Sequence, residues 1–287
     1  MKTVILGAGG QLGHALAKVL PEATRLDSKD LDITDQAAVS NYPWAGIDVV
    51  INAAAYTNVD GAETAEGHKA AWAANAAAVA SLAASANAHD FILVHISSDY
   101  VFDGTATQPI PEDATMAPLS VYGTTKAAGD IAAELANHHY LVRTSWVVGD
   151  GQNFVRIMEK LGASGISPTV VCDQIGRLSF TTELADAIVH LVTTKAPYGT
   201  YNVTGSGEPA SWAEVAREVF AVKGYQGLSV TDQTTVDYFA SKPKAAKRPL
   251  YSVLDLAKIE ATGFTPQDWR ISLKAYLTGT DIATTKS

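Results

Sequence analysis

The sequence is poor in cysteine and in basic residues. Its 287 residues contain one cysteine, Cys172, which excludes a disulfide framework or a cysteine-based zinc site within one chain. Lys and Arg total 21 against 30 Asp and Glu, and the formal net charge of -9 argues against general binding to nucleic acid or to anionic membranes. A single cysteine fits a reducing compartment, so we expect a cytoplasmic protein with no nucleic-acid or membrane partner.

Long hydrophobic runs are also missing. No stretch reaches the roughly 18 apolar residues that a membrane span needs. The apolar stretch after Met1 is too short for a signal peptide, and we expect it to be a buried strand instead. The overall content, 47% apolar and 18% charged residues, is that of a soluble globular protein with one large domain or two closely packed ones.

Short apolar runs without alternation recur along the first half of the chain. They occupy residues 3–6, 47–51, 91–96 and 140–143, and helical patterns separate them. Such runs are typical of strands that are covered on both faces of a parallel sheet. The sequence therefore predicts an α/β fold.

A glycine-rich turn follows the first run. Gly7, Gly10 and Gly13 have the spacing G-x-x-G-x-x-G, and a helical pattern begins at Leu12. Glycines allow the chain to turn sharply and approach a pyrophosphate, and the helix N-terminus then offers free N–H groups to it. This turn predicts a dinucleotide site.

The cofactor form is left open by the residues after the second predicted strand, 23–26. Asp27 stands where an acid usually accepts the adenosine ribose hydroxyls and favours NADH, whereas Arg25 and Lys29 could meet the 2′-phosphate of NADPH. Asp32 could reach the adenine amine, or it could cap a helix that starts near Thr34.

The chemistry is predicted by Tyr122 and Lys126. They are four residues apart, so a helix brings them to one face, and the ammonium of Lys126 is expected to lower the pKa of the Tyr122 phenol. Ser98, at the end of the 91–96 strand, supplies a hydroxyl that can donate to a carbonyl oxygen while Tyr122 moves the proton. We expect His95 to be a core histidine. Asn75, inside a long helix over 70–88, could satisfy backbone groups.

The regular alternation of strand and helix weakens after residue 148. We expect a dinucleotide-binding domain over 1–148, with return segments near 173–200, and a mainly substrate-binding portion over 149–287.

A Ser-x-x-Glu capping box, Ser211 to Glu214, predicts a helix start. The basic stretch 242–249 is either a solvated loop or, through Arg248, a diphosphate contact. Residues 283–287 are expected to fray.

These residues together resemble the extended short-chain dehydrogenase/reductase superfamily. More narrowly, residues 52–60, 97–104, 143–147, 173–176 and 248–249 are similar to dTDP-4-dehydrorhamnose reductases over nearly the whole chain. The resemblance implies a Rossmann-type doubly wound parallel sheet with a smaller, discontinuous α/β substrate-binding portion. It also implies NADPH- or NADH-dependent reduction of a nucleotide-linked 4-keto sugar, with Tyr122 as the proton donor beside Ser98 and Lys126.

The resemblance also implies further contacts. Those to the cofactor come from Gly7, Gly10, Gln11, Leu12, Gly13, Asp27, Asp32, Ile33, Ala54, Ala55, Tyr56, Ile96, Tyr122 and Lys126. Those to the substrate come from Ser98, Asp99, Tyr100, Trp146, Asn153 and Arg248.

Several positions depart from the family pattern. Ser98 stands where Thr is usual, which keeps the hydroxyl but loses a methyl group, and Gly61 and Val148 replace larger residues. Some relatives form a magnesium-linked dimer; Glu183 matches one acidic position, but Ala15 occupies another, so we predict no metal site. A monomer or a homodimer is expected. Another nucleotide-sugar reductase or epimerase, or a non-catalytic regulatory subunit on the same fold, is the alternative function.

Overall fold

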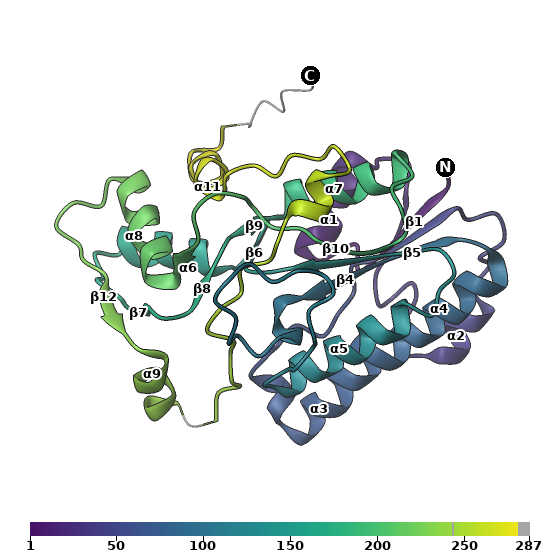
Figure 1. Cartoon of the computed structure of the whole chain (residues 1–287), viewed down its shortest axis with the longest axis horizontal. Coiled ribbons are helices and arrows are strands. Elements are labelled where there is room, and N and C mark those ends of the chain that lie inside the picture. The colour runs from purple at the N-terminus through teal and green to yellow at the C-terminus, as the bar shows by residue number, and fades with distance from the viewer. Residues whose placement is uncertain (243, 281–287) are drawn as a thin grey trace.

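The computed structural model describes residues 1–242 and 244–280. The predicted fraying of residues 283–287 therefore concerns residues outside the described part. The molecule is elongated in Figure 1, with a large layered part at one end and a smaller part at the other.

A six-stranded parallel sheet forms the centre of the larger part. Its spatial order is β10-β5-β4-β3-β1-β2. The strands are β1 (Thr3–Leu6), β2 (Thr24–Leu26), β3 (Val49–Asn52), β4 (Ile92–Ser98), β5 (His139–Thr144) and β10 (Gly199–Asn202). The chain leaves β1 toward β2 and then returns to the other side of β1 as β3. The carboxyl ends of β1 and β3 therefore flank the point where the winding reverses, which is where open α/β sheets bind ligands.

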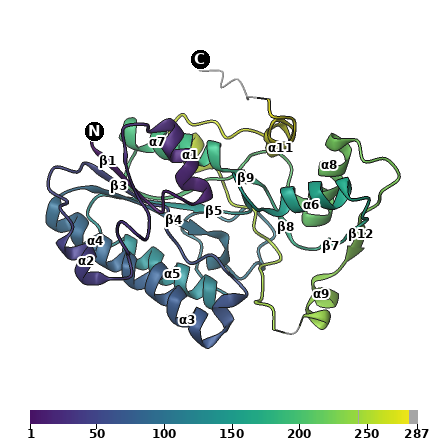
Figure 2. The ribbon, with the colours of Figure 1, turned by 180° about the vertical axis from the view of Figure 1, so that it is seen from behind.

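Helices cover both faces of this sheet (Figures 1 and 2). On one face lie α1 (Gln11–Val19), α7 (Thr181–Thr193) and the short α10 (Ala257–Glu260), whose apolar side chains share a core with Ile5, Ile51 and Val142. On the other lie α2 (Gln36–Asn41), α4 (Ala78–His89) and α5 (Val121–Ala133). β1 and β3 are buried at every residue, which explains their unbroken apolar pattern. The predicted doubly wound parallel sheet is confirmed.

The helix predicted over 70–88 is interrupted. It consists of α3 (Ala65–Trp72), a π-helical turn (Ala73–Ala77) and α4, which follow one another without a gap. A π turn of this kind changes the direction in which a helix presents its side chains and is frequent at functional sites. It contains Asn75, which is 1% exposed.

The smaller part is built mostly from the second half of the chain. Its helices are α6 (Phe154–Ala163), α8 (Trp212–Lys223), α9 (Thr235–Ser241) and α11 (Trp269–Thr278). Its short strands pair as β6 (Val147–Val148) with β9 (Ser179–Phe180), β7 (Thr169–Val171) with β12 (Thr231–Gln233), and β8 (Ile175–Gly176) with β11 (Ala210–Ser211). A separate core, which includes Val155, Val219 and Trp269, holds it together. The capping box of Ser211 and Glu214 at the start of α8 is confirmed.

The expected helix start near Thr34 is wrong. α2 begins at Gln36, and Asp35 caps it by accepting hydrogen bonds from the Ala37 and Ala38 amides. Asp32 instead accepts from the amide and hydroxyl of Thr34, at 2.9 and 2.8 Å. Within residues 1–242 and 244–280, no helix combines the length and the apolar character that crossing a membrane requires.

Candidate active site

The glycine turn lies between β1 and α1 and packs against the chain that leaves β3. Gly7 has φ +73°, and a Cβ there would lie 2.6 Å from the amide nitrogen of Ala54. A Cβ on Gly13 would lie 2.3 Å from the carbonyl oxygen of Gly7, so this third glycine allows the helix to approach the turn. Gly10 is the N-cap of α1, and without a side chain it leaves the first helical amides open. The turn thus has the cradle and the helix N-terminus that fit a pyrophosphate.

The carboxylate of Asp27 lies next to this turn. A Cβ on Gly9 would be 3.4 Å from Asp27 Oδ2, so the acid at the end of β2 faces the glycines. Arg25 points elsewhere: its guanidinium donates to the carbonyl oxygens of Ala17 and Pro21 at 3.2 and 3.3 Å. In this arrangement a carboxylate, and not the guanidinium of Arg25, is available to the adenosine ribose.

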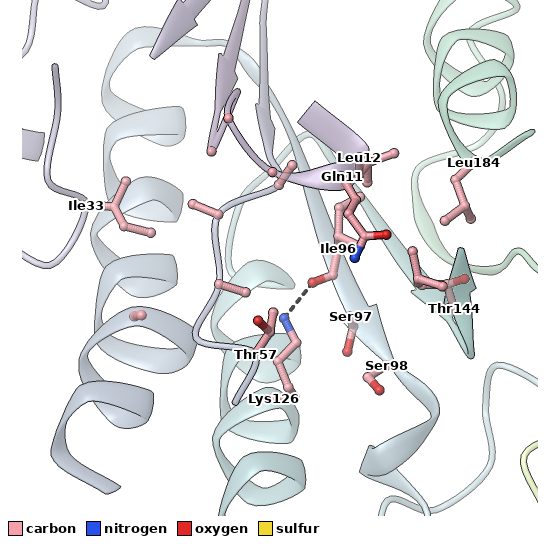
Figure 3. A pocket seen from close by; sticks show the side chains of 18 of the residues that line it. Gln11, Leu12, Ile33, Thr57, Ile96, Ser97, Ser98, Lys126, Thr144 and Leu184 are labelled. Carbon is pink, nitrogen blue, oxygen red and sulfur yellow. Dashed lines mark hydrogen bonds between the residues drawn. The ribbon is translucent and has the colours of Figure 1, made fainter. Parts of the chain in front are cut away.

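Tyr122 and Lys126 lie in the first two turns of α5. Ser120 caps this helix by accepting a hydrogen bond from the Gly123 amide. The Lys126 side chain, 2% exposed, reaches toward β4, and its Nζ donates to the carbonyl oxygen of Ile96 at 2.6 Å (Figure 3). Burial lowers the pKa of Lys126 to about 8, while nearby Asp130 acts in the opposite direction.

The predicted lowering of the Tyr122 pKa is not what the structure gives. Burial, followed by the carboxylate of Asp99, raises the pKa of Tyr122 to about 12, and the neighbouring Ser98 hydroxyl acts in the opposite direction. The charge of Lys126 is not among the influences that shift the Tyr122 pKa, and its Nζ donates to the Ile96 carbonyl. The phenol is thus in its protonated form at neutral pH, the form from which it can donate a proton.

Ser98 and Asp99 stand at the carboxyl end of β4. The Ser98 hydroxyl donates to Asp99 Oδ1 at 3.0 Å, and it accepts from the Tyr100 amide at 3.2 Å. Figure 3 shows Ser98 at the end of its strand, on the same side of the pocket as Lys126. Burial raises the pKa of Asp99 to about 6, although hydrogen bonds from Ser252 and Ser98 favour its charged form. Tyr122 therefore has both a hydroxyl partner and a buried carboxylate beside it.

Buried polar side chains hold α5 in place. Asn75 bonds the amide and the carbonyl of Tyr56, at 2.9 and 3.1 Å, and donates to Thr125 at 3.1 Å, so it satisfies backbone groups as expected. Gly129 makes the contact possible, because a Cβ there would lie 2.1 Å from the Asn75 carbonyl oxygen. His95, 1% exposed, lies in the core as predicted.

One cavity of about 1010 Å³ connects these features. Most of the predicted site residues line it: Gly7, Gly10, Gln11, Leu12, Asp27, Asp32, Ile33, Ala54, Ala55, Ile96, Ser98, Asp99, Tyr100, Tyr122, Lys126 and Trp146. The cavity runs from the β2 end of the sheet, past the glycine turn, to Trp146 at the entrance of the smaller part. It brings the glycine turn and the Ser98–Tyr122 pair into one space.

Four predicted site residues lie outside the cavity lining. Gly13 packs under the turn, and Tyr56 is held through its backbone by Asn75. Asn153 caps α6 and donates to the carbonyl oxygen of Gly149 and to the Tyr276 hydroxyl, both at 2.9 Å. Arg248 is paired with the carboxylate of Asp60. Asn153 and Arg248 thus lie outside the cavity lining, and their roles as substrate ligands stay predictions.

Other lining residues escaped the sequence analysis. They include Thr57 after β3, Thr144 at the end of β5 with Ser145 next to it, and Asp150 with Gly151 in the loop before α6. The sequence could have indicated Thr57, Thr144 and Ser145, because each of them follows a predicted strand at its carboxyl end. The loop residues carry no such signal.

Trp146 forms the wall at the far end of the cavity. Its φ of +48° is unusual for a residue with a large side chain. Its indole stacks on that of Trp212 with centroids 3.6 Å apart, and a Cβ on Gly176 would lie 2.7 Å from the ring. Because both contacts hold the ring, Trp146 is a fixed surface against which a ligand can rest.

Comparison with known proteins decides the family. The family model described as "RmlD substrate binding domain" matches residues 1–282. The dTDP-4-dehydrorhamnose reductase of Aggregatibacter actinomycetemcomitans is 38% identical over 293 residues, covering 95% of this chain and 97% of that protein. The chain belongs to the dTDP-4-dehydrorhamnose reductase family. It is thus an oxidoreductase that depends on a nicotinamide dinucleotide, and it has the fold of the short-chain dehydrogenase/reductase superfamily.

Further relatives of the reductase show the range of the family. A Streptomyces antibioticus protein named probable dTDP-4,6-dihydroxy-2-methyloxan-3-one 4-ketoreductase is 38% identical, with 96% of this chain and 94% of that protein covered. The crystal structure of a Clostridium acetobutylicum dTDP-4-dehydrorhamnose reductase has a TM-score of 0.91 at 39% identity, covering 98% and 100% of the two chains. That of the Bacillus anthracis reductase, in complex with NADP, has a TM-score of 0.88 at 34% identity with the same coverage.

Proposed function

We propose that the reductase converts the C4 keto group of dTDP-4-dehydro-L-rhamnose to the alcohol of dTDP-L-rhamnose, using NADPH or NADH. The observation that carries the proposal is the Tyr122 phenol. It is half-buried, it lies beside Ser98 and Asp99 at the carboxyl end of β4, and it lines the same cavity as the glycine turn. The names of the family members support the substrate.

Different residues along the cavity have different roles in the reaction. The nicotinamide supplies a hydride to C4 when the cofactor is bound. Ser98 donates a hydrogen bond to the substrate carbonyl oxygen, and Tyr122 delivers its proton to that oxygen as the C–H bond forms, which gives the alcohol. Lys126, fixed on the Ile96 carbonyl, keeps a positive charge near the resulting phenolate.

The remaining lining residues bind and orient. Gly7, Gly10, Gln11 and Leu12 receive the pyrophosphate, while Asp27, Asp32 and Ile33 receive the adenosine. Ala54, Ala55 and Ile96 lie along the path to the nicotinamide, and Asp99, Tyr100 and Trp146 contact the sugar nucleotide. We assign residues 1–148, with the later return segments, to the cofactor and residues 149–287 mainly to the substrate. The single cysteine supports a cytoplasmic location.

A spectrophotometric assay tests the proposal. The purified chain is mixed with dTDP-4-dehydro-L-rhamnose and either NADH or NADPH, nicotinamide absorbance is followed, and the sugar product is identified by NMR. We expect oxidation of the cofactor with formation of dTDP-L-rhamnose in equal amount. Cofactor binding without reduction of any keto sugar would favour a regulatory subunit, and co-purification of tightly held NAD⁺ would favour an epimerase.

A second candidate substrate follows from the Streptomyces antibioticus relative, which is named as a 4-ketoreductase of a different dTDP sugar and is equally similar to this chain. The two substrates compete in the same assay. A kcat/KM that is higher for dTDP-4,6-dihydroxy-2-methyloxan-3-one would assign the reductase to that reaction.

A further inference from the structure

The basic stretch near the end of the chain does not face the cavity as a free cation. Arg248 Nη2 donates to both carboxylate oxygens of Asp60, at 3.0 and 3.1 Å. Its Nη1 donates to the Ala246 carbonyl oxygen at 3.1 Å, and the Ala246 amide donates to Asp60 Oδ1 at 3.0 Å. Asp60 therefore holds both the side chain and the backbone of this stretch. We call residues 246–250 the strap.

The strap joins segments that are far apart in the sequence. Asp60 follows β3 in the dinucleotide-binding part, whereas the strap follows α9 of the smaller part. A second contact lies at Gly104, after β4: a Cβ there would be 2.4 Å from the Leu250 amide and 2.6 Å from Pro249 Cα. From the other side, the Leu250 carbonyl accepts the Ile175 amide of β8 at 2.7 Å. The strap thus ties the two parts together beside the site.

Tyr100 connects the strap to the chemistry. The Arg248 guanidinium lies close to the Tyr100 phenol, since it opposes the rise in the Tyr100 pKa that burial causes. The ring of Tyr100 meets that of Tyr122 edge to face, with centroids 5.4 Å apart and planes at 84°. Aromatic pairs prefer this geometry, so a fixed Tyr100 restricts the orientation of the Tyr122 ring.

We propose that the Asp60–Arg248 pair is a latch that fixes the strap and, through Tyr100, sets the position of Tyr122. Asp60 and Arg248 are positioning residues of the reaction, and this inference rests on the proposed function of Tyr122. The alternative is that Arg248 binds the diphosphate of the substrate. In that role the Arg248 guanidinium would have to release the Asp60 carboxylate, which its Nη2 already bonds.

The variant Asp60→Asn separates these two roles. It keeps the shape of the side chain and removes the charge that holds Arg248. A latch predicts that kcat falls about tenfold, since small displacements of reacting groups cost up to about a hundredfold, while KM for the keto sugar changes little. If Arg248 is a diphosphate ligand, releasing it leaves kcat unchanged and lowers KM. The variant Asp60→Glu, which retains a carboxylate, should recover part of the lost kcat.

Three further measurements make the test specific. Glu218→Gln breaks a pair of similar exposure in the smaller part, Arg270 Nε to Glu218 Oε1 at 3.3 Å, and should leave kcat unchanged. Because such partly exposed pairs contribute little to stability, the melting temperature of Asp60→Asn should stay within about 2 °C of the parent. In a Tyr100→Phe background, Asp60→Asn should cause little further loss of kcat.

Hydrogen–deuterium exchange gives a readout that needs no turnover. The latch predicts faster exchange across residues 246–250 in Asp60→Asn and no change there in Glu218→Gln. An Asp60→Asn variant with kcat within twofold of the parent, or with unchanged exchange in the strap, overturns the inference. If the parent chain reduces no keto sugar, the proposed function is refuted instead. The hydrogen-exchange comparison then tests, without turnover, whether Asp60 fixes the strap.

Discussion

Asp99 is a buried acid whose ionisation should make the protein less stable as the pH rises. Its side chain is 2% exposed, and burial raises its pKa from 3.8 to about 6, against opposing hydrogen bonds from Ser252 and Ser98. A folded-state pKa above the unfolded value means that the folded state binds more protons. The stabilising effect of protonation is therefore complete below the unfolded pKa and is lost as the pH rises through about 6.

The substitution Asp99→Asn removes this titration. A rise of about two pKa units corresponds to about 3 kcal/mol, of which about 2 kcal/mol develops between about pH 4.5 and about pH 8. The free energy of unfolding of the variant, relative to that of the parent, should increase by this amount over that range. The substitution can also change the free energy of unfolding by an amount that does not depend on pH, for example through an imperfectly bonded amide. That amount is the same at every pH and does not alter the change across the pH range.

Urea unfolding of both proteins across this pH range provides the measurement. Asp103→Asn serves as the control, because hydrogen bonds from Thr105 lower the pKa of that partly exposed carboxyl and predict a small effect of the opposite sign. A difference between Asp99→Asn and the parent that stays flat with pH would refute the reasoning. It would mean that Asp99 titrates in the folded state as it does in the unfolded chain.

Three further predictions concern cofactor, packing and chemistry. Asp27→Ser should raise the ratio of kcat/KM for NADPH to that for NADH by about tenfold, because it removes a carboxylate that repels a 2′-phosphate; an unchanged ratio would place the ribose elsewhere. Gly129→Ala forces a Cβ to within 2.1 Å of the Asn75 carbonyl oxygen and should cost about 2 kcal/mol or more in urea unfolding, whereas an unaltered midpoint contradicts the close helix contact. Ser98→Ala should lower kcat by about tenfold to a hundredfold with unaltered cofactor affinity, and full activity would exclude the hydroxyl from the reaction.

The parallel sheet and the glycine turn could be predicted because local pattern and tertiary environment agree there. β1 and β3 are apolar at every position since both their faces are covered, and Gly7 is required by a positive φ. Tyr122 and Lys126 share a helix, so their spacing alone brought them together. For these features, short-range sequence information was sufficient.

The remaining features depend on contacts between distant segments. The sequence left the role of Arg248 open, as part of a solvated loop or as a diphosphate contact, because its partner, Asp60, is 188 residues away in the sequence. The Tyr122 pKa was expected to fall because the spacing to Lys126 is visible in the sequence, while burial and the Asp99 carboxylate are not. The π-helical turn at Asn75 likewise follows from packing against Gly129 of α5 and has no local signature.

The most direct test of the account is the variant Tyr122→Phe, which deletes one hydroxyl from a half-buried ring. The parent and the variant are compared for NADH and NADPH binding by nicotinamide fluorescence, and for turnover of dTDP-4-dehydro-L-rhamnose. The account predicts unchanged cofactor affinity with turnover lower by about a hundredfold to ten-thousandfold, the contribution expected of a proton donor. Turnover close to that of the parent would contradict it, since the proton would then come from another group.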